Sequence, residues 1–217
     1  MLTDVREALR YVGIRTPDAE QLKQAENAAR HLESAVNPRF VWKLFPIERA
    51  AEGLLLTGTR VLLTGRSSEK MLAECDRCVL LAVTLGPAAD TLVRAASARD
   101  MTEAVLLDAC ASALTESGCG LAEKEIRARF PDLYLTDRFS PGYGDLPLDT
   151  QPAILSALDA GRRLGLYLTG SLLMNPSKSV TAVIGLAPVP QRARIRGCAY
   201  CAMNADCALR KGGHSCA

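Results

Sequence analysis

The chain has 217 residues, 48% hydrophobic and 23% charged, which is the composition of a globular protein with one sizeable core. Its 26 basic and 24 acidic residues give a net charge of +2, which argues against the basic surface of a nucleic-acid-binding protein. No apolar stretch approaches the length of a membrane span, and the acidic N-terminus does not fit a signal peptide. We therefore expect a cytoplasmic protein with no nucleic-acid partner and no membrane partner, whose cysteines are reduced thiols or metal ligands.

The first part of the chain predicts a helix and several short elements. Thr16 can cap the first helix, with Pro17 in its first turn, and apolar residues then recur at helical spacing until Asn37-Pro38 ends it. The elements that follow are a strand at 40–45, a strand at 61–64 and a helix at 67–74.

The middle of the chain carries its clearest secondary-structure signals. A continuous apolar run at 78–85 is typical of a buried central strand, and a helix at 87–98 follows it. An Asp-x-x-Glu capping box then starts a long helix at 100–129. Gly118 and Gly120 lie inside this helix, where glycine costs about 1 kcal/mol against alanine, so they predict close approach of a ligand or a strand.

The last part predicts a strand at 133–139, a helix at 150–163 and strands at 166–169 and 180–186. Helices and strands are mixed without a regular βαβ repeat, which predicts an α+β fold around a largely antiparallel sheet.

The most informative segment has the sequence RFSPGY and covers residues 138–143. Pro141 pre-sets φ for a turn, and Gly142 can take the positive φ that a type II turn needs. Arg138 and Tyr143 are therefore predicted to lie close together on one rigid corner. Such a corner could bind a carboxylate and face a planar or cationic ligand. A hairpin with a surface arginine is the alternative interpretation.

The pattern R-x-x-x-G-Y, followed by L-T-x-S-x-x-M-x-P-x-x-S-V at 168–180, resembles the activation (reactivation) domain of vitamin B12-dependent methionine synthase. The resemblance covers residues 80–185, and Asp145 and Pro147 make it similar to the stand-alone versions of that domain. The fused enzyme instead has Cys-Pro and a His after Gly-Tyr, so the adenine pocket and the docking surface are expected to differ in detail.

The resemblance implies a fold and a division of the chain. We expect a single C-shaped domain at 1–190, with helices flanking a twisted, largely antiparallel sheet, and a Cys-rich C-terminal tail at 191–217.

The resemblance also implies S-adenosylmethionine as the ligand, together with the residues that contact it. Arg138 would bind its carboxylate, Glu116 would meet its positive charge, and Pro141 and Gly142 would shape the turn beside it. Tyr143, the candidate catalytic residue, would face the corrin of cobalamin. A solvated charge on a helix surface is the alternative interpretation of Glu116.

The resemblance implies a stand-alone reactivation protein that supports reductive methylation of cob(II)alamin on a separate methionine synthase chain lacking its own activation domain. The chain has no D-x-H-x-x-G motif, so cobalamin would be supplied by that partner chain, and the electron donor is unknown. It has no glycine-rich dinucleotide loop, which disfavours a Rossmann-type methyltransferase. The alternatives are a non-catalytic S-adenosylmethionine-binding module and a metal or iron–sulfur electron-transfer protein, and whether the chain is itself an enzyme stays open.

The tail carries a candidate metal site with the spacing C-x2-C-x5-C-x8-C. Its four thiols are Cys198, Cys201, Cys207 and Cys216. Zinc would hold the tail together, whereas an iron–sulfur cluster suits a reaction that consumes an electron, and we favour the cluster. Free thiols on a flexible tail are the third possibility. The remaining cysteines are expected to pack in the core: Cys75, Cys78, Cys110 and Cys119.

Overall fold

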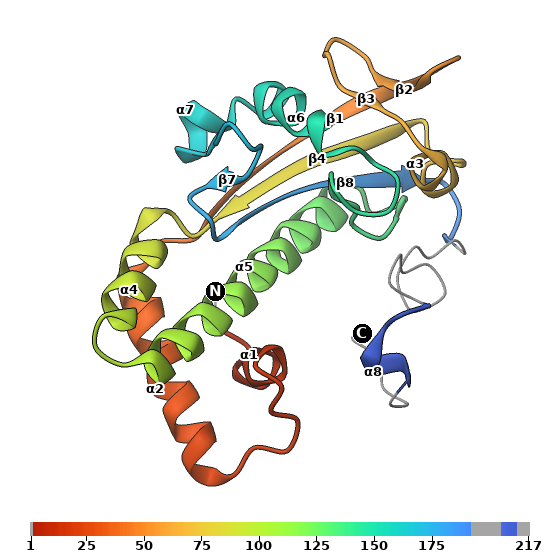
Figure 1. Ribbon diagram of the computed structural model, residues 1–217. Coiled ribbons are helices and arrows are strands. Elements are labelled where there is room, and N and C mark those ends of the chain that lie inside the picture. The colour runs from red at the N-terminus through yellow and green to blue at the C-terminus, as the bar shows by residue number, and fades with distance from the viewer. Residues whose placement is uncertain (1, 192–204, 212–217) are drawn as a thin grey trace. The chain divides into compact units, whose positions relative to one another are not determined.

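The computed structural model describes residues 2–191 and 205–211 (Figure 1). It is a mixed α/β fold with a twisted antiparallel sheet and flanking helices, which confirms the predicted α+β class. The chain forms two compact units, which are described separately below. Unit 1 consists of Met1–Val41, Ala82–Ile126 and Leu158–Val180, and unit 2 of Trp42–Leu81, Arg127–Ala157 and Thr181–Ala217. The C-shaped outline and the domain boundary at residue 190 stay predictions.

The main sheet has six strands in the order β3-β2-β1-β4-β8-β5. The pairs β1–β2, β2–β3 and β5–β8 are antiparallel, and a separate antiparallel pair joins β6 to β7. The strands of the main sheet are β1 (Arg39–Ala50), β2 (Gly53–Leu56), β3 (Leu62–Leu63), β4 (Arg77–Thr84), β5 (Tyr134–Leu135) and β8 (Ser179–Ala187). The small pair consists of β6 (Tyr167–Leu168) and β7 (Met174–Asn175).

The two long apolar runs of the sequence form buried strands. Every residue of β4 after Arg77 is buried, and β8 is buried except at Val180. A strand covered on both faces reads as a continuous hydrophobic run, which is why these two could be predicted.

The helices of unit 1 pack around a core rich in alanine and leucine, with Leu9, Leu32, Leu107 and Leu114 at its centre. These helices are α1 (Val5–Tyr11), α2 (Ala19–Ala35), α4 (Pro87–Ser97) and the greater part of α5 (Met101–Arg129). The short helix α7 (Ala160–Leu164) also belongs to unit 1 and contributes no residue to this core. The cap of α2 is Asp18 rather than the expected Thr16. Asp18 has extended backbone angles, its carboxylate accepts from Gln21 N–H at 2.8 Å, and the Gln21 side chain accepts from Asp18 N–H in return.

The long helix α5 begins where the sequence predicts it, because the Asp100 carboxylate accepts from the Thr102 and Glu103 amides. It continues through both of its glycines without a break. A Cβ on Gly120 would meet no described atom within 4 Å, so close approach of a strand is wrong at this position, and close approach of a ligand stays a prediction.

Unit 2 contains α3 (Arg66–Met71), the 3-10 turn η1 (Leu148–Thr150), nearly all of α6 (Gln151–Leu158) and, near the end of the chain, α8 (Ala208–Lys211). The single helix expected at 150–163 is in fact two, α6 and α7. Asp159 between them has φ +55°, a left-handed conformation that no helix continues through.

Candidate functional site

Arg138 lies at a β-bulge beside β8 in unit 2. Leu135 pairs with Leu186, and Phe139 pairs with Val183 through two backbone hydrogen bonds of 3.0 and 2.7 Å. Four residue steps separate Leu135 from Phe139, whereas three separate their partners. The extra residue is a bulge, so the continuous strand expected at 133–139 is wrong. The bulge leaves Arg138 half-buried just before the Pro-Gly turn.

A close approach of β8 fixes the bulge. Thr136 N–H donates to the Gly185 carbonyl at 3.0 Å, and Gly185 N–H donates to the Thr136 hydroxyl at 2.8 Å. A Cβ on Gly185 would lie 2.6 Å from both Cys75 Sγ and Leu72 Cδ2. Only glycine fits at position 185, because any side chain would clash with Cys75 and Leu72. This close contact and the two hydrogen bonds to Thr136 set the position of the bulge.

The Pro-Gly turn has the geometry that the sequence predicts. Gly142 has φ +87°, and Tyr143 N–H donates to the Ser140 carbonyl at 3.2 Å, as in a type II turn with Pro141 and Gly142 at its centre. Pro141 is buried, whereas the Tyr143 side chain is 71% exposed. The turn therefore presents a phenol ring to solvent from a fixed backbone, a few residues after Arg138.

Asp145, in the same loop, makes a polar contact that the sequence did not predict. Its carboxylate oxygens accept from the backbone N–H of Ser67, at 3.1 and 3.3 Å. Burial acts to raise the pKa of the Asp145 carboxyl, but the hydrogen bonds from Ser67 and neighbouring amides outweigh it and hold the pKa below its usual value. No local pattern could indicate a partner 78 residues away.

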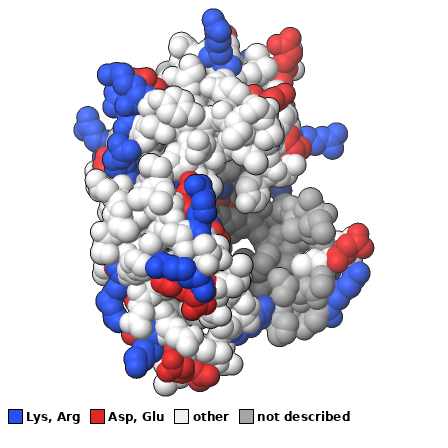
Figure 2. Space-filling view, turned by 60° about the vertical axis from the view of Figure 1, so that its left-hand side comes forward, with Lys and Arg blue, Asp and Glu red and all other residues white. Residues whose placement is uncertain are grey.

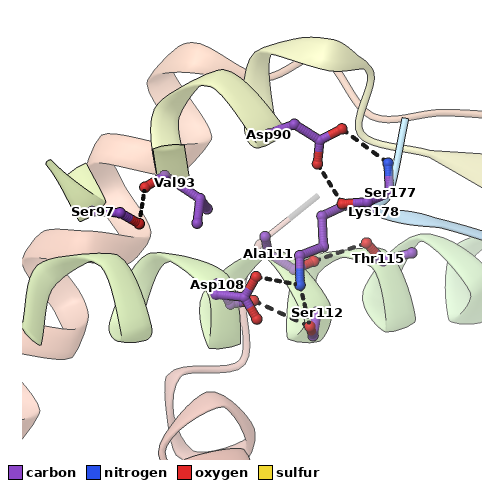
Figure 3. A network of polar contacts seen from close by, with 9 residues as sticks. All are labelled: Asp90, Val93, Ser97, Asp108, Ala111, Ser112, Thr115, Ser177 and Lys178. Atoms are coloured by element: carbon purple, nitrogen blue, oxygen red, sulfur yellow. Dashed lines mark hydrogen bonds and ion pairs between the residues drawn. The ribbon is translucent and has the colours of Figure 1, made fainter. Parts of the chain in front are cut away.

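The second half of the motif, in unit 1, ties the β7–β8 turn to the helices (Figure 3). Lys178 Nζ lies 2.8 Å from Asp108 Oδ1 and donates to Ser112 Oγ at 3.0 Å. Asp90 accepts from Ser177 N–H at 2.9 Å and from the Ser177 hydroxyl. These residues anchor the turn on α4 and α5, which is a structural role.

The motif serine Ser179 has a similar role. Its buried hydroxyl lies 2.8 Å from Thr84 Oγ1 and 2.7 Å from the Pro176 carbonyl, and Thr84 Oγ1 accepts from Gly86 N–H. The hydroxyl thus joins the start of β8 to the end of β4.

Glu116 lies on α5 in unit 1 and is exposed, so the apolar neighbourhood of its sequence does not enclose its side chain. It lies close enough to Tyr11 of α1 to affect that phenol. Burial, a hydrogen bond to Glu7 and the charges of Glu7 and Glu116 raise the pKa of Tyr11 to about 12. Glu116 belongs to unit 1, whereas the loop that carries Tyr143 (residues 139–146, the Tyr143 loop) belongs to unit 2. A ligand cleft shared by the two stays a prediction.

A groove of about 470 Å³ lies in unit 1. The predicted ligand residues are not among those that line it. Its lining is mainly apolar and comes from α1, α4 and α5, including Tyr11, Val93, Met101 and Val105, with Asp108 and Ser112 as polar members.

The four cysteines that precede the tail are buried packing residues, as predicted. Burial is the largest cause that raises the pKa of Cys75 to about 11, of Cys78 to about 12 and of Cys110 to about 11, and Cys119 is fully buried as well. The raised pKa values of Cys75, Cys78 and Cys110 keep these three thiols protonated at neutral pH, which makes them poor metal ligands and nucleophiles.

The candidate metal site of the tail is not described by the structure. Cys198, Cys201 and Cys216 lie outside the described residues, and Cys207 is half-buried. Among residues 2–191 and 205–211, no three His, Cys, Asp or Glu side chains are grouped to hold a metal ion.

The surface charges of the described residues are mixed. Figure 2 shows basic and acidic side chains interspersed over the described part of one face. Within the described part of the chain, no helix is both long and apolar enough to cross a bilayer.

Comparison with solved structures identifies the fold. The chain is similar to the crystal structure of the MetH reactivation domain bound to AdoHcy, with a TM-score of 0.63 and 20% sequence identity, over 94% of this chain and 77% of that one. No protein-family model and no curated protein matches the chain. The chain therefore has the fold of a reactivation domain.

Proposed function

We propose that this chain binds S-adenosylmethionine and supports the reductive methylation of cob(II)alamin carried by a separate methionine synthase chain. The observation that carries the proposal is the likeness, over nearly the whole chain, to a reactivation domain bound to AdoHcy. AdoHcy is S-adenosylmethionine after loss of its methyl group, so a fold that holds one suits the other.

Arg138 and Tyr143, both in unit 2, suit two different binding partners. Arg138 offers a half-buried guanidinium, which binds a carboxylate more strongly than an exposed one because water competes less. Tyr143 offers an exposed ring on a rigid turn, suited to a flat partner surface. We assign Arg138 and the turn residues Pro141 and Gly142 to S-adenosylmethionine, with Glu116 meeting its positive charge, and Tyr143 to the corrin face.

The methyl group and the electron come from outside the chain. S-adenosylmethionine supplies the methyl group, and a separate donor supplies one electron to the cobalt of the partner. This chain contributes binding and orientation of the two reactants, which bring their reactive groups into contact. We place the reaction in the cytoplasm, and we leave the donor unnamed.

The test adds purified protein, S-adenosylmethionine and a reductant to a cob(II)alamin-loaded methionine synthase that lacks its own activation domain. Return of the methylcobalamin absorbance, with one AdoHcy formed per cobalt, is the expected result. Binding of S-adenosylmethionine without methylation would favour the non-catalytic binding module. Absence of both binding and methylation would refute the proposal. The isolated chain should not copurify with a coloured corrinoid.

A further inference from the structure

The Tyr143 loop is fastened at two ends. At its start, Phe139 exchanges two backbone hydrogen bonds with Val183 of β8, and its side chain is buried. At its end, Leu146 is 2% exposed, and its carbonyl accepts from Gly142 N–H at 2.9 Å. Tyr143, between these points, also accepts from Leu146 N–H through its own carbonyl at 3.2 Å. The loop is therefore held at Phe139 and at Leu146.

Asp145 adds a contact to a distant segment. Besides the hydrogen bonds from Ser67 N–H, the backbones themselves meet here. A Cβ on Gly65 would lie 2.6 Å from the Asp145 carbonyl oxygen and 2.8 Å from Oδ1. A Cβ on Gly144 would lie 3.2 Å from Ser67 Oγ. The segments 65–67 and 144–145 thus fit together only because glycines face the contact, and the carboxylate joins them.

We propose that Asp145 is a positioning residue, whose carboxylate fastens the Tyr143 loop to the segment 65–67 and so sets where the phenol ring is presented. The role toward the corrin partner rests on the proposed function, whereas the fastening does not. Without the carboxylate, the loop keeps its turn and its hold on β8 but gains freedom between Tyr143 and Leu146. The ring then samples a wider range of positions, and the productive one is populated less.

The test compares Asp145→Ala and Asp145→Asn with Asp149→Ala as the control. Asp149 is an exposed carboxylate of the same segment, with the same charge. Hydrogen–deuterium exchange should rise about tenfold at the Ser67 amide and across residues 143–146 in Asp145→Ala, as expected for loss of a hydrogen bond to a charged acceptor. Amides of β8 should not change. Asn keeps one acceptor oxygen, so it should restore part of the protection.

The position of the ring is measured by the ring-carbon NMR signal of Tyr143, assigned with Tyr143→Phe. It should shift in Asp145→Ala, move back in Asp145→Asn and stay in Asp149→Ala. With the partner, Asp145→Ala should lower the single-turnover methylation rate and leave the affinity for S-adenosylmethionine within about threefold, since Arg138 is untouched.

Unchanged exchange or an unchanged Tyr143 signal in Asp145→Ala would overturn the proposal. A normal methylation rate in Asp145→Ala, when hydrogen–deuterium exchange shows that the loop is more mobile, would also overturn it. A wild type that shows no methylation refutes the proposed function instead, and the exchange and NMR results then decide the fastening alone.

Discussion

Gly185→Ala tests the close approach that fixes the bulge before Arg138. The new methyl group would lie 2.6 Å from Cys75 Sγ, 2.6 Å from Leu72 Cδ2 and 2.8 Å from Thr136 Cγ2, all shorter than van der Waals contact. Cys75 and Leu72 are at most 1% exposed, so neither has free space to enter. Overpacking of this kind destabilises a core by about 1–3 kcal/mol. In a chain of this size we expect the melting temperature to fall by about 2–12 °C.

The matched control is Gly120→Ala on α5, where a Cβ would meet no described atom within 4 Å. There the methyl group should stabilise the helix by about 0.5–1 kcal/mol, because alanine loses less backbone entropy than glycine. Urea unfolding at a fixed m-value measures both changes. A Gly185→Ala protein as stable as the wild type, or two glycine variants that shift together, would refute the packing argument.

The remaining predictions concern the ligand, the partner, the polar network and the tail. Arg138→Ala should weaken S-adenosylmethionine binding by about 1.5–3 kcal/mol in calorimetry, whereas the exposed Arg129→Ala should not; equal affinities would rule out the assignment. Tyr143→Phe and Tyr143→Ala should keep that affinity within about threefold and change the methylation rate; wild-type rates in both would place the ring elsewhere. Lys178→Met should lower the free energy of unfolding by about 1 kcal/mol rather than the roughly 3–5 kcal/mol of a fully buried ion pair, because the Asp108 side chain is 55% exposed and water can replace the ammonium. Thermal unfolding measures this change, and a loss of about 3 kcal/mol or more would contradict the reasoning. Anaerobic purification followed by iron, sulfide and zinc analysis tests the tail site; a colourless protein with one zinc removes the redox role, and no metal removes the site formed by Cys198, Cys201, Cys207 and Cys216.

The elements that could be predicted from the sequence are those whose signal is local. The strand β4 is a continuous apolar run, and α5 combines a capping carboxylate at Asp100 with a long helical stretch. The turn at Pro141 and Gly142 was predictable for the same reason, because both residues constrain φ themselves.

The elements that the sequence did not predict depend on contacts with residues far away in the sequence. The strand β2 exists through its pairing with β1, and α1 is a short helix whose Ala8 and Leu9 become buried only in the packed core. The left-handed Asp159 divides a segment that reads as one helix. The bulge before Arg138 arises from the register of two strands, which no property of the strand's own residues expresses.

In the candidate site, the sequence indicated the Arg138 and Tyr143 turn but not what holds it. Asp145 was visible only as part of a motif, and its contact with Ser67 comes from the fold. Ser179 belongs to the sequence motif and Lys178 precedes it, and the structure shows that both side chains anchor the turn between β7 and β8. Glu116 is exposed, and its role depends on ligand data that a sequence does not contain.

The buried thiols make each unit its own unfolding reporter. Cys110 and Cys119 lie in unit 1, and Cys75 and Cys78 lie in unit 2. Because all four are buried in the folded chain, a thiol reagent can reach them only when the surrounding core opens. Peptide mapping of the modified cysteines over time would therefore reveal whether the two units open in one cooperative step or in succession, without any engineered label.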